Sequence, residues 1–434
     1  MYDRKLITPE LIAELSEKRR LMREEGFALA TPIIGEDGVA ALKELYSLYD
    51  EGIYLWLADL WEPDIGAFYY SNSARDTEGF LPDIESTVQA LRYIKHSGLE
   101  AALGGPYEKN LPLWMQKKVS SFAKSLQDPD GYFYHPQWGK GVGTSRRSRD
   151  LGWAIEAITD FGFKPNYPTP LDKKEGEEKP STLLPDHLRS TDAFRDYLSG
   201  LKIIGNSYFV GNLISSQSAQ IKAAGREFID ILVDWFEKQQ NPQNGTWEKE
   251  VTFTATNGLM KVTLTYSSLG LPFPNAEAAM DSAVKMTLSP IEAGQITSYY
   301  NPWITMQMLM DNLSRFGRSD VAETLRKKLK ENAAAMIRNT IVKVKAFQKP
   351  EGCFSYNPHQ SAPRSQGAPV AIPGTNEGDI NGNGLGSTGI TNHVCKAIGI
   401  PPVPLFCKED GELYFRLLES AVSTKKIYPP ISFD

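Results

Sequence analysis

Residues 126–139, LQDPDGYFYHPQWG, follow a predicted amphipathic helix and place a proline, a glycine and several aromatic residues in one short stretch. The first half of this stretch, which ends at Phe133, has three further copies in the chain. In each copy a proline lies two residues after a glutamine or a tryptophan, a glycine follows, and an aromatic residue lies two positions after the glycine. The four copies are Trp61–Phe68, Gln127–Phe133, Gln240–Trp247 and Gln348–Phe354.

The repeated segment has the chemistry of a turn that ends a helix. Proline interrupts helical hydrogen bonding, glycine adopts backbone conformations that other residues resist, and the aromatic side chain packs back on the helix just left. Gly66, Gly131, Gly245 and Gly352 are spaced at close to one, two and two multiples of roughly 55 residues, about the length of two helices with their connections. We therefore predict an all-α fold, an (α/α)6-type toroid of helical hairpins that forms a single domain over residues 1–434.

Apolar spacing predicts helices along most of the chain, and two segments depart from this pattern. β-branched residues flank Asn257-Gly258, which predicts a small β-hairpin near residues 251–266. Residues 165–192 contain several prolines and a run of mixed charge, which predicts a long loop excursion rather than a domain boundary.

The composition argues against several classes of protein. The net charge is -6, from 47 basic and 53 acidic residues that are interspersed, so we expect no nucleic-acid partner. The charged N-terminus lacks the apolar core of a secretory signal and no stretch approaches the length of a membrane span, so we expect a cytoplasmic protein with no membrane partner. Cys353, Cys395 and Cys407 lack the spacing of a redox or metal motif and are expected to be free packing residues.

The four repeated segments resemble the QW repeat of the terpenoid cyclase and protein prenyltransferase toroids, and similar turns appear in α/α-toroid glycosidases and polysaccharide lyases. The resemblance implies that the repeat is structural, so Gln127, Gly131 and Phe133 are not expected to be catalytic. For a class II terpenoid cyclase it also implies an Asp-x-Asp-Asp proton donor, which this sequence lacks. His393 and Cys395 have no supporting zinc ligands at informative spacing, so we expect no metal and no cofactor.

The loops between the predicted helices are dense in aromatic and hydrogen-bonding residues, which suits the binding of an oligosaccharide. After the first repeat turn, Asp83 and Glu85 lie at a helix start and are more readily explained as helix caps than as catalysts. The residues before them are less easily explained in this way, and Asp76 is a candidate catalytic acid. The candidate substrate ligands of this stretch are Tyr70, Asn72 and Arg75.

The second half of the opening stretch, from Tyr134 to Gly139, has no further copy. His135 is a candidate catalytic base, and Trp138 is a candidate stacking platform for a sugar. Several cations follow, and arginine presents a fork that matches a carboxylate or a sulfate. Arg146 and Arg147 are therefore candidate ligands of an acidic sugar, with a solvated basic helix start as the alternative.

Two stretches later in the chain contain tyrosines and a histidine. Tyr299 and Tyr300 are candidate bases, and Asn301 and Trp303 beside them are candidate substrate ligands; the alternative is a set of core aromatic residues with Asn301 as a helix cap. His359, another candidate catalytic residue, follows the last repeat turn as His135 follows the second. Equivalent turns are expected at the same end of the ring, so the two histidines are expected to share a face. Asn357 is a candidate substrate ligand of the same stretch.

The glycine-rich residues 374–388 form the last candidate stretch. Its opening matches an EF-hand loop, but Ile390 occupies the position of the required glutamate, so calcium is not expected. Glu377 and Asp379 are candidate catalytic acids in this polar loop. The candidate substrate ligands are Asn376 and Asn381.

Two mechanisms suit these residues. A glycoside hydrolase needs two carboxyl groups across the scissile bond, for which the candidates are Asp76, Glu377 and Asp379. A lyase needs a tyrosine or histidine base and a cation or amide that offsets a uronate carboxylate. We expect an enzyme that cleaves glycosidic bonds in oligosaccharides, with the cations favouring acidic, uronate-containing substrates. The alternatives are a hydrolase of neutral oligosaccharides, a terpenoid cyclase or prenyltransferase, and a non-catalytic glycan-binding scaffold.

Overall fold

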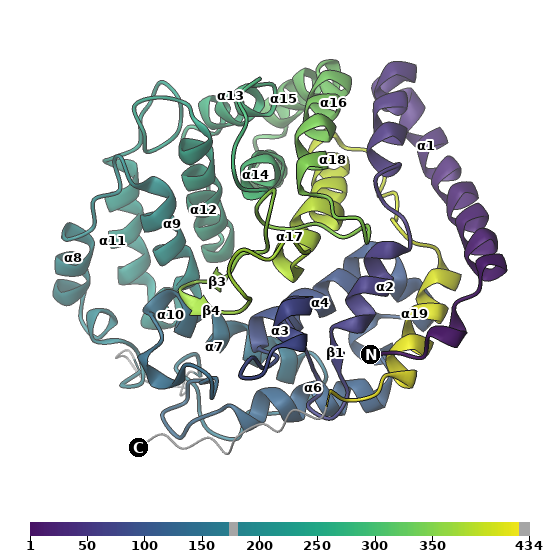
Figure 1. Cartoon of the computed structure of the whole chain (residues 1–434). Coiled ribbons are helices and arrows are strands. Elements are labelled where there is room, and N and C mark those ends of the chain that lie inside the picture. Colours follow the sequence, from purple (N-terminus) through teal and green to yellow (C-terminus); the bar gives the residue numbers. More distant parts are fainter. Residues whose placement is uncertain (173–180, 425–434) are drawn as a thin grey trace.

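The computed structural model describes residues 1–172 and 181–424, and this part of the chain is almost entirely helical. Six helical segments form a closed inner ring, in which each one packs against the next and the last packs against the first (Figure 1). The sixth segment is a continuous run of two α-helices joined by a π-helical turn at Leu385–Gly389. In chain order the inner helices are α4 (Ile84–Ser97), α7 (Thr144–Thr159), α9 (Ser207–Ser216), α12 (Phe253–Leu269), α14 (Thr297–Arg315) and α17–α18 (Ile380–Gly384 and Ile390–Ile398).

An outer helix precedes each inner helix, so the chain runs around the ring as alternating outer and inner helices (Figure 1). These outer helices are α2 (Gly52–Asp59), α6 (Leu113–Ser125), α8 (Thr191–Ser199), α11 (Arg226–Glu237), α13 (Ala276–Thr287) and α16 (Ala333–Val344). The remaining helices are α1 (Pro9–Tyr46), α3 (Asn72–Asp76), α5 (Tyr107–Asn110), α10 (Ser218–Ala224), α15 (Ser319–Glu331) and α19 (Lys408–Ser420). The predicted all-α ring of helical hairpins is confirmed.

The repeat turns connect an outer helix to an inner helix and fasten each hairpin to the next one. Gly131 has a φ of 85°, and a Cβ placed on it would lie 2.4 Å from the carbonyl oxygen of Pro168, in the segment that leads to the next outer helix. Gln127 holds the same segment, because its side chain donates to the Tyr167 carbonyl and accepts from the Tyr167 amide. The same left-handed glycine occurs at Gly66, Gly245 and Gly352.

These four turns follow the first, second, fourth and sixth outer helices, which explains the spacing of their glycines along the sequence. The Gln240 and Gln348 side chains also donate to backbone carbonyls in the segments that precede the next outer helices, at Pro274 and Leu48. The last of these contacts ties the end of the ring back to its beginning. The turns are therefore the local device that closes the ring.

The predicted β-hairpin near residues 251–266 is wrong, because this segment forms the inner helix α12. Its threonine hydroxyls donate to carbonyls one turn back, as Thr263 does to Leu259, which satisfies them inside a helix. Gly258 is needed for packing and not for a turn, since a Cβ there would lie 2.2 Å from the Ser207 hydroxyl of the neighbouring helix α9. The strands that the structure does describe are two short pairs, β1 (Trp61–Glu62) with β2 (Ala67–Phe68) and β3 (Arg364–Ser365) with β4 (Ala368–Pro369).

Two other predicted segments differ from expectation in detail. The region expected to be a long loop has no α-helix among its described residues until α8 begins at Thr191, apart from a 3-10 turn at Asp186–Leu188; residues 173–180 lie outside the described part of the chain. The glycine-rich stretch is a loop only as far as Asp379, because α17 begins at Ile380. Gly382 permits this helix start to pack closely, since a Cβ there would lie 2.2 Å from the Ser355 backbone.

The inner helices run parallel, so that their N-terminal ends meet at one end of the ring. Contacts between neighbouring helix starts show this arrangement at three places on the ring. The Arg146 side chain on α7 reaches Asp83 before α4, Asn301 on α14 donates to Asn257 on α12, and the Ile380 amide of α17 donates to the Tyr70 carbonyl before α4. We call this end of the ring the N-terminal face.

The core of the protein extends from Tyr2 to Leu418 as one connected cluster of buried apolar side chains. Cys353, Cys395 and Cys407 are buried and free, as expected of packing residues. A second, small cluster consists of Tyr70, Ala362, Val370 and Ala371 and lies apart from the main core. Across residues 1–172 and 181–424, every helix is too short or too polar to cross a membrane.

Candidate functional site

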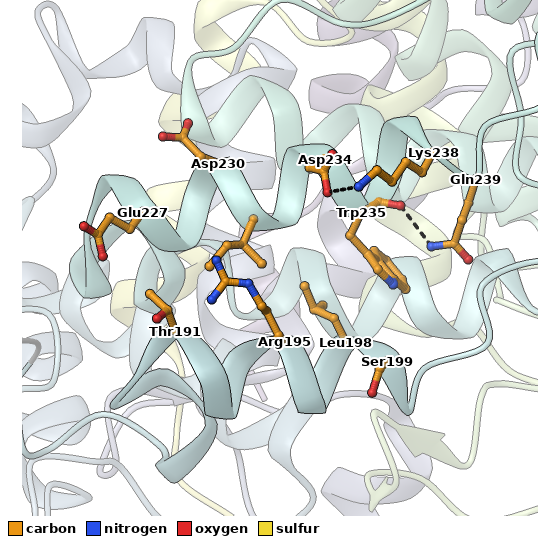
Figure 2. Close-up of a pocket in the computed structure, with 11 residues that line it drawn as sticks. Thr191, Arg195, Leu198, Ser199, Glu227, Asp230, Asp234, Trp235, Lys238 and Gln239 are labelled. Carbon is orange, nitrogen blue, oxygen red and sulfur yellow. Dashed lines mark hydrogen bonds and ion pairs between the residues drawn. The ribbon is translucent and has the colours of Figure 1, made fainter.

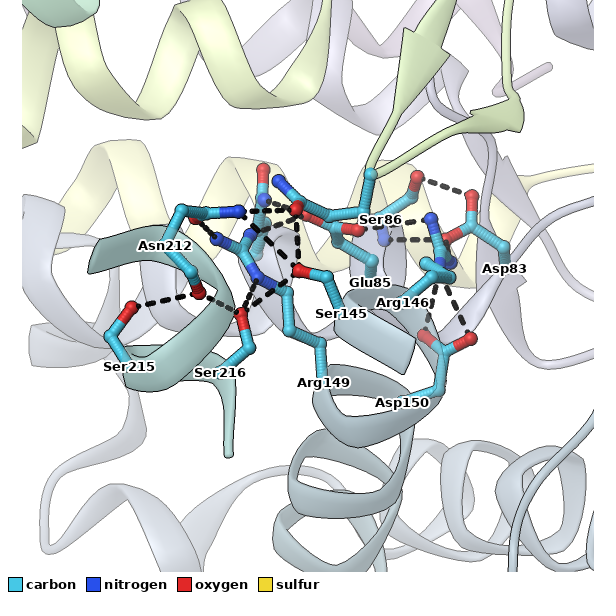
Figure 3. Close-up of polar contacts among 12 residues, drawn as sticks. Asp83, Glu85, Ser86, Ser145, Arg146, Arg149, Asp150, Asn212, Ser215 and Ser216 are labelled. Carbon is cyan, nitrogen blue, oxygen red and sulfur yellow. Dashed lines mark hydrogen bonds and ion pairs between the residues drawn. The ribbon is translucent and has the colours of Figure 1, made fainter. Parts of the chain in front are cut away.

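At the N-terminal face, one buried arginine holds three carboxylates (Figure 3). Arg146 lies in the first turn of α7 and is fully buried. Its guanidinium nitrogens lie 2.7 Å from Asp83, 2.9 Å from Glu85 and 2.9 Å from Asp150. Asp83 also caps α4 by accepting from the Ser86 amide, which was the role expected for it. Two helices are therefore joined by a charge cluster from which water is excluded.

A second arginine extends this cluster toward the lumen of the ring. Arg149, one turn further along α7, lies 3.2 Å from Glu85 and donates to the Asn212 side chain of α9 at 2.9 Å. Glu85 therefore lies between two guanidinium groups and is only 1% exposed. Ser145 and Asn212 donate in turn to the side-chain oxygen of Gln366, at the tip of the β3–β4 hairpin, each at 2.8 Å.

Three titratable groups near this cluster have shifted pKa values. Burial raises the pKa of Asp150 to about 7, and the attraction of Arg146 only partly offsets this effect. Burial also acts on Asp83, but Arg146 and the Ser86 hydroxyl outweigh it and lower the pKa of that carboxyl. On α12, which packs against α9, burial and the charge of Arg149 lower the pKa of Lys261 to about 7.

Aromatic side chains line the N-terminal face beside the charge cluster. The half-buried Trp138 and Tyr356 pack against the small apolar cluster that contains Tyr70. Tyr70 is buried, and burial followed by the negative charges of Asp379 and Glu85 holds its pKa well above the usual value. Its hydroxyl therefore lies in the field of carboxyl groups from two different helices. His135 stacks on Trp138 with ring centroids 3.9 Å apart.

Asp379 and Glu377 are both buried at the N-terminal face and hold its loops. Asp379 caps α17 by accepting from the Gly382 amide, and it also accepts from the Tyr356 and Ala362 amides. Burial raises the pKa of Asp379 to about 6, although these amide hydrogen bonds oppose the shift. Glu377 accepts from Ser73 and Ser361, which joins helix α3 to the loop before β3.

Several predicted catalytic residues have other roles in the structure. His135 is fully buried and bonded to the Pro82 carbonyl, and burial lowers its pKa to about 4, so it is a neutral packing residue. Asp76 has a side chain that is 60% exposed and pairs with Arg75. His359 is exposed, so it does not share the buried environment of His135.

The hydroxyl groups of the two predicted tyrosine bases also contact other groups of the protein. The Tyr299 hydroxyl accepts from the Ala293 amide and donates to the Ala293 carbonyl, whereas the Tyr300 hydroxyl lies 3.2 Å from His393. Burial raises the pKa of both phenols, which keeps them protonated near neutral pH, so the phenolate that would act as the base is scarce. Neither tyrosine is therefore a good candidate for proton abstraction.

The predicted substrate ligands divide into residues at the N-terminal face and residues used elsewhere. Arg146 is contradicted as a ligand, because its guanidinium is buried among three carboxylates. Trp303 is fully buried and donates to Thr340, so it belongs to the core. Four other predicted ligands contact neighbouring side chains: Asn301 is buried against Asn257, Arg75 pairs with Asp76, Arg147 lies over the Tyr132 ring, and Asn376 accepts from Lys349. The last three are half-buried. Asn357 lies in the turn opposite Gln360, and Asn72 and Asn381 lie at the starts of α3 and α17.

Four polar residues in or near the charge cluster were not among the predicted ligands or catalysts. Glu85 was assigned to helix capping, although Asp83 alone supplies the cap. Arg149 follows Arg146 by nearly one helical turn, a spacing that places both on neighbouring faces of α7. Asn212 and Lys261 carry no sequence signal, because their helices were not predicted to border the site.

A cavity on the outer surface lies elsewhere, between α8 and α11 (Figure 2). It has a volume of about 960 Å³, and Leu198, Ile231 and Trp235 form its apolar part. The carboxylates Asp230 and Asp234 in its lining form exposed ion pairs with residues on their own helix. None of the predicted catalytic or ligand residues lines this cavity.

Within residues 1–172 and 181–424, no three histidine, cysteine, aspartate or glutamate side chains gather in a way that would hold a metal ion. No family model and no curated protein matches the chain. A solved structure to which the chain is similar is a glycoside hydrolase family 15 glucoamylase from Hypocrea jecorina, with 9% identity, 88% of this chain and 76% of that chain covered, and a TM-score of 0.39. A likeness at this level supports no inference about activity, which must come from the side chains of the site.

Proposed function

We propose that the protein hydrolyses glycosidic bonds in oligosaccharides at the N-terminal face of the ring. One observation carries the proposal: two buried carboxyl groups, Glu85 in the first turn of α4 and Asp379 at the start of α17, lie at the N-terminal face, where Trp138 and Tyr356 pack around Tyr70. Aromatic faces and forked polar groups are the usual means of holding sugar rings. A pair of carboxyl groups is the usual means of cleaving the bond between them.

The two carboxyl groups have environments that suit different roles. Asp379, whose pKa is raised to about 6, is able to carry a proton near neutral pH and donate it to the leaving oxygen. Glu85 lies between Arg146 and Arg149, which stabilise a negative charge, so it serves as the base or nucleophile. This division of labour between one protonated and one charged carboxyl is the requirement of glycoside hydrolysis.

The side chains favour hydrolysis of neutral sugars over elimination from acidic ones. A lyase needs a cation that is free to bind the substrate carboxylate, but Arg146 is fully engaged by Asp83, Glu85 and Asp150. It also needs an accessible base, and Tyr299 is bonded to backbone groups. A cyclase of hydrocarbon substrates would have an apolar cavity, which the ion pairs of this face do not provide.

The test is a hydrolysis assay on a panel of neutral and uronate-containing oligosaccharides. New reducing ends measure hydrolysis, and the ultraviolet absorbance of an unsaturated product measures elimination. We expect hydrolysis of at least one neutral substrate. Glu85→Gln should lower kcat by about 10²–10⁴-fold, the usual contribution of an acid or base group.

Glu156→Gln is the matched control for Glu85→Gln. Glu156 also pairs with an arginine across α4 and α7, but it lies at the far ends of those helices, where it bonds to Arg92. The control should keep kcat within a factor of about three, since a half-exposed ion pair contributes little. Equal losses in the two variants would refute the assignment of Glu85. Binding of an oligosaccharide without turnover by the wild-type protein would instead indicate a glycan-binding scaffold.

A further inference from the structure

The β3–β4 hairpin crosses the N-terminal face and places its tip on the polar residues of the candidate site. The tip consists of Gln366 and Gly367, which both have positive φ values of 50° and 87°. Glycine adopts this conformation readily, whereas a glutamine there is uncommon and costs free energy. Such a residue in a strained conformation is often kept for what its side chain does.

The Gln366 side chain has a specific position in the charge cluster. Its oxygen accepts from the Ser145 hydroxyl and from the Asn212 amide, each at 2.8 Å. The other side of the Asn212 amide accepts from Arg149, so the three ring residues form one connected set. A sugar hydroxyl oxygen accepts from the same kinds of donors, and the Gln366 amide occupies the place where it would lie.

The hairpin is joined to the rest of the protein more strongly at its base than at its tip. At the base, the Ala362 amide donates to Asp379 and the Ser361 hydroxyl donates to Glu377. Beneath it lies the small cluster around Tyr70, separate from the main core, so little buried apolar surface resists its opening. Along its length, Gln137 donates to the Pro369 carbonyl at 3.2 Å. The two hydrogen bonds that Gln366 accepts from Ser145 and Asn212 therefore hold the tip of the hairpin on the ring, and we call this pair of bonds the latch.

We propose that the β3–β4 hairpin is a lid over a sugar-binding subsite formed by Ser145, Arg149 and Asn212, and that an oligosaccharide displaces the Gln366 amide when it binds. This inference rests on the proposed function for the identity of the ligand, but not for the existence of the latch. Glu85 is only 1% exposed and bonds to Arg149, so movement of this subsite is also needed before Glu85 becomes accessible for reaction. The apparent Kd of the sugar is then the Kd of the open form divided by the fraction of molecules in which the lid is open.

Two substitutions of Gln366 should change the fraction of molecules with an open lid in opposite directions. Gln366→Asn keeps an amide and a residue that tolerates positive φ, but its side chain is too short to reach Ser145 and Asn212. Gln366→Glu keeps the length and the acceptor and adds a negative charge near Arg149. Loss of two hydrogen bonds should favour opening by about ten- to thirtyfold, and the glutamate should reduce opening.

The latch is tested first by hydrogen exchange in the protein without a sugar. The Ile372 amide, which follows the hairpin and donates to the Ser73 hydroxyl of α3 at 3.1 Å, reports on opening. We expect faster exchange there in Gln366→Asn and slower exchange in Gln366→Glu. Arg364→Gln is the control, since Arg364 bonds only within the hairpin, to the Gly367 carbonyl. Unchanged exchange in both tip variants would overturn the latch.

The subsite is tested by calorimetric titration of the same three variants with the oligosaccharide panel. Gln366→Asn should lower the Kd by up to the same ten- to thirtyfold factor, and Gln366→Glu should raise it. If exchange responds but the Kd of a bound sugar does not, the latch does not compete with the sugar and the subsite is overturned. If no variant binds any sugar, the proposed function fails together with the identity of the ligand, while the exchange result still decides the latch.

Discussion

Replacement of Arg146 by methionine would remove the guanidinium that three buried carboxylates share. Removal of one partner of a buried ion pair usually costs about 3–5 kcal/mol, because it leaves a charge without compensation. Here Asp83 and Asp150 would lose their arginine, and only Glu85 would keep a second one, Arg149. We therefore expect a loss of at least about 5 kcal/mol in the free energy of unfolding near pH 7.5.

The loss should depend on pH in a defined direction. Without Arg146, burial would raise the pKa of Asp83, which Arg146 holds low in the wild type, above its value in the unfolded chain, whereas the pKa of Asp150 is already raised in the wild type. The native state would then bind protons more readily than the unfolded state, so the variant would regain stability as the pH falls. The regained stability is about 1.4 kcal/mol per pH unit for each proton taken up. The gap from wild type should narrow by about 3 kcal/mol between pH 7.5 and pH 5.5 for one proton.

Urea unfolding followed by circular dichroism at several pH values measures both effects. Arg146→Lys, which keeps the charge but not the fork, should fall between the wild type and Arg146→Met. The control is Arg226→Met, which removes an exposed pair with Asp230 and should cost less than about 0.5 kcal/mol at all pH values. A cost for Arg146→Met that equals the control, or a gap that does not change with pH, would refute the reasoning.

Four further outcomes follow from the structure. Gly131→Ala should destabilise by about 3 kcal/mol, because the new methyl group meets the Pro168 backbone, whereas Gly79→Ala, with a similar φ of 87° but open space, should cost only about 1 kcal/mol; thermal denaturation compares them. Lys261→Met should raise the free energy of unfolding by on the order of 1–3 kcal/mol at pH 6 and by less at pH 9. The reason is that burial lowers the pKa of this amine, so the unfolded chain binds its proton more tightly than the native protein does. A gain that is the same at both pH values would contradict this. Trp303→Phe should lower the melting temperature but leave oligosaccharide affinity unchanged in titration, and a weakened affinity would return Trp303 to the site. The hydrolysis rate should fall as the pH rises above about 6, where Asp379 loses its proton, and a rate that rises there would exclude it as the acid.

The fold was predictable because its decisive signal is local. Proline, glycine and an aromatic residue within seven or eight positions describe one turn, and the recurrence of that turn gives the size of the hairpin unit. Helix α12 was not predictable in this way, because β-branched residues around Asn257-Gly258 carry the same local preference as a hairpin. The deciding factor is the neighbouring helix α9, whose Ser207 packs against Gly258.

The site was predictable only in part, because its residues come from helices far apart in the chain. Asp379, Tyr70 and Trp138 were identified from their own loops, and all three lie at the N-terminal face. Arg146 was identified as a cation but not as a buried one, since Asp83, which neutralises it, lies 63 residues earlier in the chain. The pairing of Arg149 with Asn212 likewise depends on the contact between α7 and α9.

The most direct test of the account is a crystal structure of the Asp379→Asn variant soaked with a neutral oligosaccharide that the wild-type protein cleaves. The account predicts a sugar ring beside Trp138, with its hydroxyls bonded to Ser145 and Asn212 and with Gln366 displaced from both. A sugar bound only in the outer cavity between α8 and α11, with Gln366 still in place, would contradict it.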